Sequence, residues 1–252
     1  MGVVIAQTPP VGSPVELGDS RWVFEPLGGV RGEDLIAVGA DLNPQTLVAA
    51  YRHGLFPMGV GAQGVGPIGW WCPASRGVLG PGDLHISRSL RRALRNFEIR
   101  IDTAFGAVVA GCAEENRPGR WITDELAAAY AVLHHLGWAH SVEAWQNNRL
   151  VGGLYGVSIG GLFAGESMFH TCTDASKVAL VGLVDYLEAL GESRSPWLVD
   201  VQWHTAHLGT LGVHEISREE YLETVAPLLR QQHRWPGARH GRPTRHDRAP
   251  AG

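Results

Sequence analysis

The chain has 252 residues, 44% of them hydrophobic and 18% charged, which fits an ordinary globular protein with one or two domains. The formal net charge of −4 argues against a uniformly basic nucleic-acid coat, although a basic surface can still be local. No apolar run is long enough to span a membrane, and the N-terminus lacks the basic start and sustained apolar core of a signal peptide. The three cysteines lie far apart, without the spacing of zinc ligands or a redox dithiol, so we expect reduced thiols and a cytoplasmic protein.

The two ends of the chain differ in composition from its middle. Residues 1–20 are rich in Pro and Gly and predict a flexible arm. Residues 231–252 are rich in Arg and His but poor in apolar residues, which predicts a disordered basic tail that we interpret as a solubilising end. Between them we expect a small N-terminal α+β domain over residues 21–76 and a larger domain over residues 77–230.

The expected N-terminal domain contains one clear helix, over residues 43–52. Asn43 is a suitable N-cap, Pro44 stands at the first helical position, and Gly54 lies just past the end. The residues from Gly54 to Leu79 mix Gly, Pro and aromatic side chains and predict loops and short strands.

A basic helix follows, with Ser87 as its N-cap and Leu94 near its end. Four arginines recur in this region at three- and four-residue spacing and share a face: Arg88, Arg91, Arg92 and Arg95. They could grip phosphates together, and they equally fit a solvated helix face.

Two more helices precede the main sheet. The first opens at Asp102 or Thr103 and passes through Cys112. The second is capped by Thr123, carries acidic residues in its first turn and stops at Gly137.

The stretch from Ser141 to Phe169 predicts a hairpin followed by a third antiparallel strand. Asn147 and Asn148 tolerate the positive φ that a two-residue turn demands. Six glycines interrupt the apolar run after the turn, which predicts bends, bulges or the close approach of another backbone or a ligand. Glu166 lies in this run, and a carboxylate among apolar neighbours needs a partner or a function.

The remaining elements are an amphipathic helix over residues 175–190, a strand over residues 197–203 and a helix from Ser217, where Glu220 completes a capping box. The order of helices, antiparallel strands, helix, strand and helix predicts a mixed α+β domain with packed helices and a mainly antiparallel sheet.

Two common motifs do not carry the chemistry. Gly156 to Gly160 fits the Gly-x-Ser-x-Gly pattern of serine hydrolases, but the next residues continue as strand, so the required strand-to-helix elbow is missing. The twelve histidines do not form a metal-ligand pattern, since His134 and His135 are adjacent on a helix and His204 and His207 have no nearby acidic or third histidine ligand. We therefore expect surface or capping histidines and no metal.

Asp200 and Gln202 are more informative. Alternation along a strand places both on one face, and their apolar neighbours indicate a central strand. Two polar side chains on such a face are costly unless they bond to each other or to a ligand, so this pair predicts either a buried structural hydrogen bond or a site.

Several segments together resemble one family of enzymes. The segments are LHISRS, RWIT, GGLYG, GLFAGESMF, ASK and LVDVQ in the larger domain, and AVGADLNPQTLVAAYRHGLFPM and WWCP in the smaller one. They are similar to the leucyl/phenylalanyl-tRNA–protein transferases over roughly residues 22–229. The resemblance implies a larger domain similar in fold to the GCN5-related acetyltransferases, with a small N-terminal domain in front. It also implies an enzyme that moves Leu, Phe or Met from aminoacyl-tRNA to a protein with N-terminal Arg or Lys and so marks it for degradation.

The resemblance also implies roles for particular residues. Asp200 would orient the attacking amine or accept its proton, Gln202 would hydrogen-bond the reacting centre, and Glu166 would meet the cationic acceptor. Whether Asp200 or the tRNA ribose takes the proton stays open. The aminoacyl pocket would be lined by six apolar residues, which also fit a plain core: Leu154, Phe163, Met168, Leu180, Leu183 and Val199.

The tRNA 3′ end would meet Trp121, which could stack on a base, and Met58, which stands where many relatives have Trp. The leucine at position 154 stands where Met is common, a volume-similar change that could adjust donor preference modestly. Because an aminoacyl ester is already activated, we expect no cofactor. We expect a monomer.

Two other functions compete with transfer of an amino acid from aminoacyl-tRNA. A CoA-dependent acyltransferase needs a glycine-rich pyrophosphate loop, whereas residues 170–176, HTCTDAS, have no glycine. A non-catalytic adaptor that recognises basic N-termini needs Glu166 but not the pair of Asp200 and Gln202.

Overall fold

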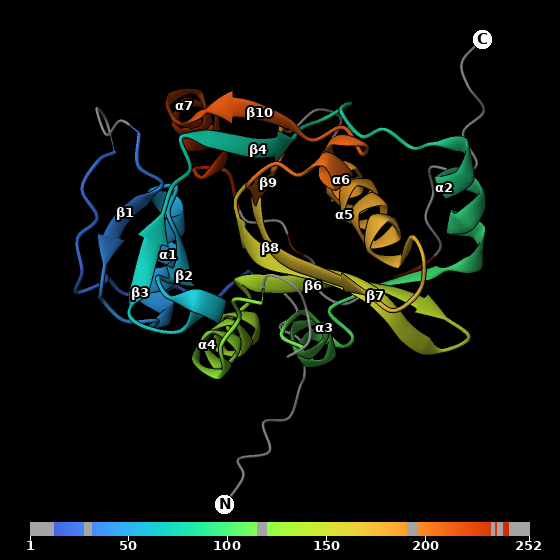
Figure 1. Ribbon diagram of the computed structural model, residues 1–252, viewed down its shortest axis with the longest axis horizontal. Helices are drawn as coiled ribbons and strands as arrows, with labels where there is room; N and C mark the ends of the chain where they lie inside the picture. The colour runs from blue at the N-terminus through green and yellow to red at the C-terminus, as the bar shows by residue number, and fades with distance from the viewer. Residues whose placement is uncertain are drawn as a thin grey trace, which may run out of the picture.

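Two β-sheets of unequal size organise the chain (Figure 1). The computed structural model describes residues 13–27, 32–114, 120–190, 196–232, 235 and 239–241. The smaller sheet is antiparallel, with the strand order β1-β3-β2, and the larger has the order β10-β4-β9-β8-β7-β6-β5-β11. Every neighbouring pair in these two sheets is antiparallel except β8 and β9, which run parallel. The expectation of a mixed α+β protein with a mainly antiparallel sheet is confirmed.

The bounds of the elements are as follows. The strands are β1 (Leu35–Val38), β2 (Phe56–Gly59), β3 (Ile68–Trp71), β4 (Ser75–Leu79), β5 (Glu98–Ile101), β6 (Ala139–Gln146), β7 (Arg149–Ile159), β8 (Leu162–His170), β9 (Leu198–Gln202), β10 (His214–Ser217) and β11 (Arg239–Gly241). The helices are α1 (Pro44–Arg52), α2 (Arg88–Ala93), α3 (Phe105–Cys112), α4 (Asp124–His135), α5 (Ala175–Leu190), α6 (Ala206–Gly209) and α7 (Arg218–Leu228), with 3-10 turns η1 (Ala62–Gly64) and η2 (Leu94–Asn96).

Helices cover both faces of the larger sheet. α5 packs on β6, β7 and β8 from one side, while α3 and α4 pack against the same part of the sheet from the other (Figure 1). α1 lies with the smaller sheet and also reaches α4, so it bridges the two parts of the molecule. The apolar core accordingly forms layers on either side of the larger sheet.

Side-chain caps begin the helices where the sequence predicts them. Ser87, Thr123 and Ser217 each accept a hydrogen bond from the backbone N–H three residues later. At α1 the side chain of Asn43 makes no such bond, and Pro44 at the first helical position sets the start instead.

The predicted hairpin is confirmed. Asn147 and Asn148 have φ values of 48° and 58°, the left-handed pair that a tight turn between β6 and β7 requires. Ser158 is buried inside β7, which confirms that the Gly-x-Ser-x-Gly match is not a nucleophile elbow.

The expectation of a flexible N-terminal arm over residues 1–20 needs correction in its second half. Residues 1–12 lie outside the described part of the chain, but Val15 is held to the body of the protein. Its N–H donates to the carbonyl of Leu136, and its carbonyl accepts from the indole Nε1 of Trp138. These bonds tie the second half of the expected flexible arm to the end of α4 and the start of β6.

The expectation of a disordered C-terminal tail also needs correction. Trp235 is buried, and β11 pairs with β5 in antiparallel register. The expectation of disorder is wrong for these residues because one large aromatic side chain provides the apolar burial that the composition of the tail as a whole lacks. The rest of the tail beyond residue 232 lies outside the described residues. No helix in the described part of the chain has the length and apolar character to cross a membrane.

Candidate active site

An apolar pocket of about 250 Å³ opens between β7, β8, β9, α5 and α6. It is lined by Leu154, Phe163, Gly165, Glu166, Ser167, Met168, Leu180, Leu183, Val199, Val201, Gln202, Thr205, His207 and Leu208. All six residues expected in an aminoacyl pocket therefore line this one pocket, together with Glu166 and Gln202. Asp200 is not among the lining residues.

Strand register explains why these side chains meet. Leu154 on β7 pairs with Met168 on β8, and Phe163 on β8 pairs with Val199 on β9. Side chains of paired residues stand on the same face of a sheet, and the register shift beside Glu166 brings Phe163 and Met168, which are five positions apart on β8, to one face. The α5 helix covers that face and contributes its buried leucines at three-residue spacing.

Glu166 lies at one end of the pocket with only 8% of its surface exposed. Tyr51 on α1 donates a 2.7 Å hydrogen bond to Oε1, and Tyr130 on α4 donates a 2.6 Å bond to Oε2. Burial raises the pKa of this carboxyl to about 7, and the two tyrosine hydrogen bonds only partly oppose that rise. Burial and the charge of Glu166 raise the pKa of both tyrosines well above 10, so they remain donors.

Asp200 is fully buried and accepts hydrogen bonds from four donors. Arg76 donates from Nε to Oδ1 at 2.8 Å and from Nη2 to Oδ2 at 2.6 Å, a fork that satisfies both oxygens. Tyr221 donates to Oδ2 at 2.8 Å, and the backbone N–H of Gln202 donates to Oδ1 at 2.8 Å. Burial alone lowers the pKa of Arg76, but the charge of Asp200 outweighs it and raises that pKa, so the guanidinium stays protonated.

Gln202 combines an unusual backbone with a free amide. Its φ is 59°, a left-handed conformation that non-glycine residues rarely adopt and that the Asp200 carboxylate stabilises through the Gln202 N–H. Its side-chain Nε2 is buried, and no acceptor for it lies within reach among the described residues. Gln202 also lines the pocket, so a buried donor without a partner among the described residues belongs to the pocket wall.

Four residues of this network were not predicted from the sequence: Tyr51, Arg76, Tyr130 and Tyr221. All four are almost completely buried. Arg76 stands at the start of an apolar strand, and this was the one available indication, since a buried arginine requires a buried acid.

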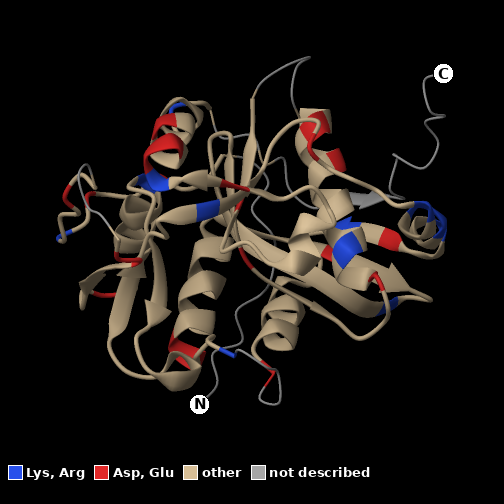
Figure 2. Ribbon diagram, turned by 45° about the horizontal axis from the view of Figure 1, so that its top comes forward, with Lys and Arg blue, Asp and Glu red and all other residues tan. Residues whose placement is uncertain are grey.

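The four predicted phosphate-binding arginines lie apart from the pocket, in and just after α2. Arg88, Arg92 and Arg95 are exposed and Arg91 is half-buried. In the ribbon of Figure 2, the α2 region at one side of the molecule carries the blue of Lys and Arg. Within the described part of the chain, none of the four forms an ion pair.

Met58 and Trp121 approach a common loop, although neither lines the pocket. A Cβ at Gly59, the residue after Met58, would lie 1.8 Å from the carbonyl oxygen of Gly64. A Cβ at Gly64 would lie 2.0 Å from the carbonyl oxygen of Trp121. The loop containing Gly64 therefore packs directly between the two segments that carry these side chains.

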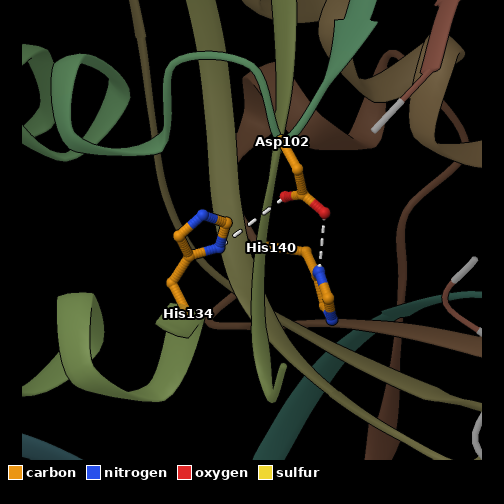
Figure 3. A group of neighbouring side chains, drawn as sticks. All are labelled: Asp102, His134 and His140. Atoms are coloured by element: carbon orange, nitrogen blue, oxygen red, sulfur yellow. Dashed lines mark hydrogen bonds and ion pairs between the residues drawn. The ribbon is translucent and has the colours of Figure 1, made fainter. Parts of the chain in front are cut away.

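A third polar cluster joins Asp102, which follows β5, His134 at the end of α4 and His140 on β6 (Figure 3). It corrects the expectation of surface histidines, because His140 is buried. His140 Nδ1 lies 2.8 Å from Asp102 Oδ2, and its Nε2 faces the carbonyl of Gly137 at 3.1 Å. His134 Nδ1 faces the carbonyl of Ala139 at 2.8 Å and must carry a proton there. These ring nitrogens are committed to hydrogen bonds, so the cluster fits a structural network better than a metal site.

The family of the chain follows from comparison with known sequences. A family profile described as leucyl/phenylalanyl-tRNA protein transferase matches residues 78–226, and the profile of its N-terminal domain matches residues 40–74. The chain belongs to the leucyl/phenylalanyl-tRNA protein transferase family. The matched range 78–226 includes every pocket residue and also Asp200, the partner of Arg76. Trp235 lies beyond this range.

Individual members of the leucyl/phenylalanyl-tRNA protein transferase family agree along most of their length. The protein of that name from Aromatoleum aromaticum is 50% identical over 198 residues, which cover 77% of this chain and 81% of the relative. The protein from Nitratidesulfovibrio vulgaris strain DP4 is 46% identical over 224 residues, which cover 86% and 92%. The protein from Anaeromyxobacter sp. strain K is 48% identical over 204 residues, which cover 79% and 84%.

The buried ion pair predicts a large effect on stability. Replacing Arg76 by Met leaves the Asp200 charge buried without its partner, so the free energy of unfolding should fall by about 3–5 kcal/mol. The double variant Arg76→Met, Asp200→Leu removes both charges and should regain much of that loss. Urea denaturation of the parent, both single variants and the double variant measures the coupling.

Arg100→Met is the matched control, because Arg100 pairs with the half-exposed Glu98 at 2.9 Å. It should cost no more than about 1 kcal/mol. An Arg76→Met protein with the urea midpoint of the parent would show that the pair contributes nothing to the fold.

Proposed function

We propose that this enzyme transfers Leu or Phe, and also Met, from aminoacyl-tRNA to proteins that begin with Arg or Lys, forming a peptide bond that marks them for degradation. One observation carries the proposal: a single apolar pocket has Gln202, with its unpaired amide, and the buried acid Glu166 in its wall. The apolar part suits a Leu or Phe side chain, the amide suits the ester, and the acid suits a cationic acceptor. Family membership supports the same reaction.

The donor side chain enters the part of the pocket between β7, β8 and α5. Its walls carry only apolar groups from the six residues already described, so they favour Leu, Phe or Met over polar side chains. A volume of about 250 Å³ is enough for a side chain together with part of the aminoacyl group.

The acceptor places its N-terminal Arg or Lys side chain beside Glu166. A cation next to this carboxylate stabilises the ionised form, which burial alone disfavours. Tyr51 and Tyr130 hold the two carboxylate oxygens from α1 and α4 and so orient the acid toward the pocket.

In the chemical step the neutral α-amine attacks the ester carbonyl carbon, the new C–N bond forms, and the C–O bond to the tRNA ribose breaks. Gln202 donates its free amide N–H to the oxyanion that develops on the carbonyl oxygen. Asp200 acts as a positioning residue, because its carboxylate already has four donors and fixes the backbone of Gln202. The proton lost by the amine passes to the departing ribose oxygen.

The tRNA lies across the outside of the enzyme. The exposed arginines of the α2 region contact its phosphates, and Trp121 and Met58 meet its 3′ end. We assign the larger sheet to the GCN5-related acetyltransferase type, a proposal supported by α5 packing on an antiparallel sheet that ends in the parallel pair β8 and β9. The enzyme acts as a cytoplasmic monomer without a cofactor.

Transfer of labelled leucine from charged tRNA tests the reaction. A peptide that begins with Arg should accept leucine, and the same peptide with an acetylated N-terminus should not, because only the free amine can attack. A peptide that begins with Glu is the specificity control. Binding of tRNA or peptide without any transfer would contradict catalysis and support an adaptor that recognises basic N-termini.

Gln202 predicts a selective loss in the chemical step. Gln202→Met keeps the length of the side chain but removes the N–H donor, and Gln202→Glu replaces the donor with an acceptor. Both should lower kcat by roughly 10²–10³-fold, as expected for one oxyanion donor, with little change in the KM for tRNA. Equal kcat values in the parent and in Gln202→Met would remove Gln202 from the reaction.

Glu166 predicts a pH dependence for acceptor use. With a pKa near 7, this group is a carboxylate above pH 7 and increasingly neutral below it, so attraction for the acceptor cation should weaken as the pH falls. The ratio of kcat/KM between the parent and Glu166→Gln, measured with an Arg peptide, should fall roughly tenfold from pH 8 to pH 6.

Glu166→Gln is its own control in this experiment, because protonation of the acceptor amine affects both enzymes equally and cancels in the ratio. A ratio that stays constant across this pH range would separate Glu166 from acceptor binding.

A further inference from the structure

Trp235 lies directly behind a wall of the pocket. Its indole ring is 3% exposed, and it stacks on Phe163 with ring centroids 5.6 Å apart and an angle of 21° between the planes. Phe163 lines the pocket and is itself completely buried. The indole therefore packs on a residue of the pocket wall without lining the pocket itself.

The indole is held firmly in this position. Its Nε1 donates a 2.7 Å hydrogen bond to Asp102 Oδ2, the oxygen that also meets His140. The ring of His140 stacks on the indole with centroids 4.2 Å apart, and Tyr186 packs at 4.7 Å. The network of Asp102 and His140 in Figure 3 thus forms an anchor for Trp235.

Phe163 has little freedom to move in other directions. A Cβ at Gly156 would lie 2.6 Å from Cε1 of the Phe163 ring, so this ring edge rests against the bare backbone of β7. Val199 is its neighbour on β9 in the sheet register. The space occupied by Trp235 is therefore the space into which Phe163 would retreat if it yielded to a larger ligand.

We propose that Trp235 is a specificity-determining residue that braces Phe163 and so sets the depth of the aminoacyl pocket. This inference rests on the proposed function of that pocket as the donor site. Removal of the indole leaves a void behind Phe163, and the phenyl ring can then move back when a bulky donor enters. The pocket deepens, and Phe is accepted more readily relative to Leu.

The test measures kcat/KM with leucyl-tRNA and phenylalanyl-tRNA for the full-length parent and Trp235→Ala. The ratio of Phe to Leu use should rise roughly tenfold in the variant, a change typical of one or two carbon atoms in an apolar pocket. Trp235→Phe keeps a ring behind Phe163 but cannot donate to Asp102, so its ratio should stay close to that of the parent even if its Tm falls.

Trp138→Ala is the matched control for loss of a buried indole. Trp138 is 7% exposed and donates its Nε1 to the Val15 carbonyl, and it belongs to the core layer on the opposite side of the sheet from Trp235. Its removal should lower Tm without changing the donor ratio. A Trp235→Ala enzyme with a lowered Tm and the donor ratio of the parent would overturn the proposal.

Two further variants separate the possible failures. If Trp235→Ala does not fold, Trp235→Leu must still raise the Phe-to-Leu ratio of kcat/KM. An unchanged ratio in Trp235→Leu would contradict the proposed role of Trp235. Phe163→Leu changes the pocket wall itself. Suppose that the parent transfers both Leu and Phe and that Phe163→Leu leaves the Phe-to-Leu ratio of kcat/KM unchanged. The donor side chain then lies elsewhere, which overturns the inference about Trp235 but not the proposed reaction. A parent that transfers neither donor disproves the proposed function itself.

Discussion

The ion pair between Arg76 and Asp200 is the interaction on which the site depends. Burying two charges costs several kcal/mol each, and the fold recovers this cost only because nearly every lone pair and N–H has a partner. Arg76 also donates to the carbonyl of Gly54 at 3.1 Å, just after α1. The pair therefore links β4, β9, α7 and the N-terminal region and holds the polar end of the pocket in one geometry.

The two buried carboxylates of the site behave differently because their partners differ. Asp200 faces a guanidinium, which supplies a full positive charge as well as hydrogen bonds. Glu166 faces two neutral tyrosines, and burial raises its pKa to about 7 because their hydrogen bonds only partly oppose the effect of burial. One acid is thereby committed to structure, while the other retains an affinity for a cation that arrives from outside.

The parts of the structure that depend on local pattern were predictable from the sequence. The turn at Asn147 and Asn148 and the cap at Ser217 both follow from spacing within a few residues. Strict alternation does not hold at Gln202, because its left-handed φ of 59° interrupts the strand geometry, and Gln202 lines the pocket whereas Asp200 does not. The six pocket residues came from family resemblance rather than from pattern, since apolar side chains in a pocket and in a core look alike in a sequence.

Contacts between distant segments could not be read from local pattern. Arg76 and Asp200 are separated by 124 positions, and Tyr51 and Glu166 by 115. The burial of Trp235 does not follow from the composition of the tail, because composition averages over a segment whereas single side chains become buried.

The last part of the chain completes the site. Tyr221 shields Asp200, β10 pairs with the strand that carries Arg76, and Trp235 fills the space behind Phe163. All three follow β9 in the sequence, so the enclosure of the site requires segments beyond the strand that carries Asp200. A chain truncated before α7 would lose Tyr221 and Trp235 together, and with them the donor to Asp200 and the ring that packs on Phe163.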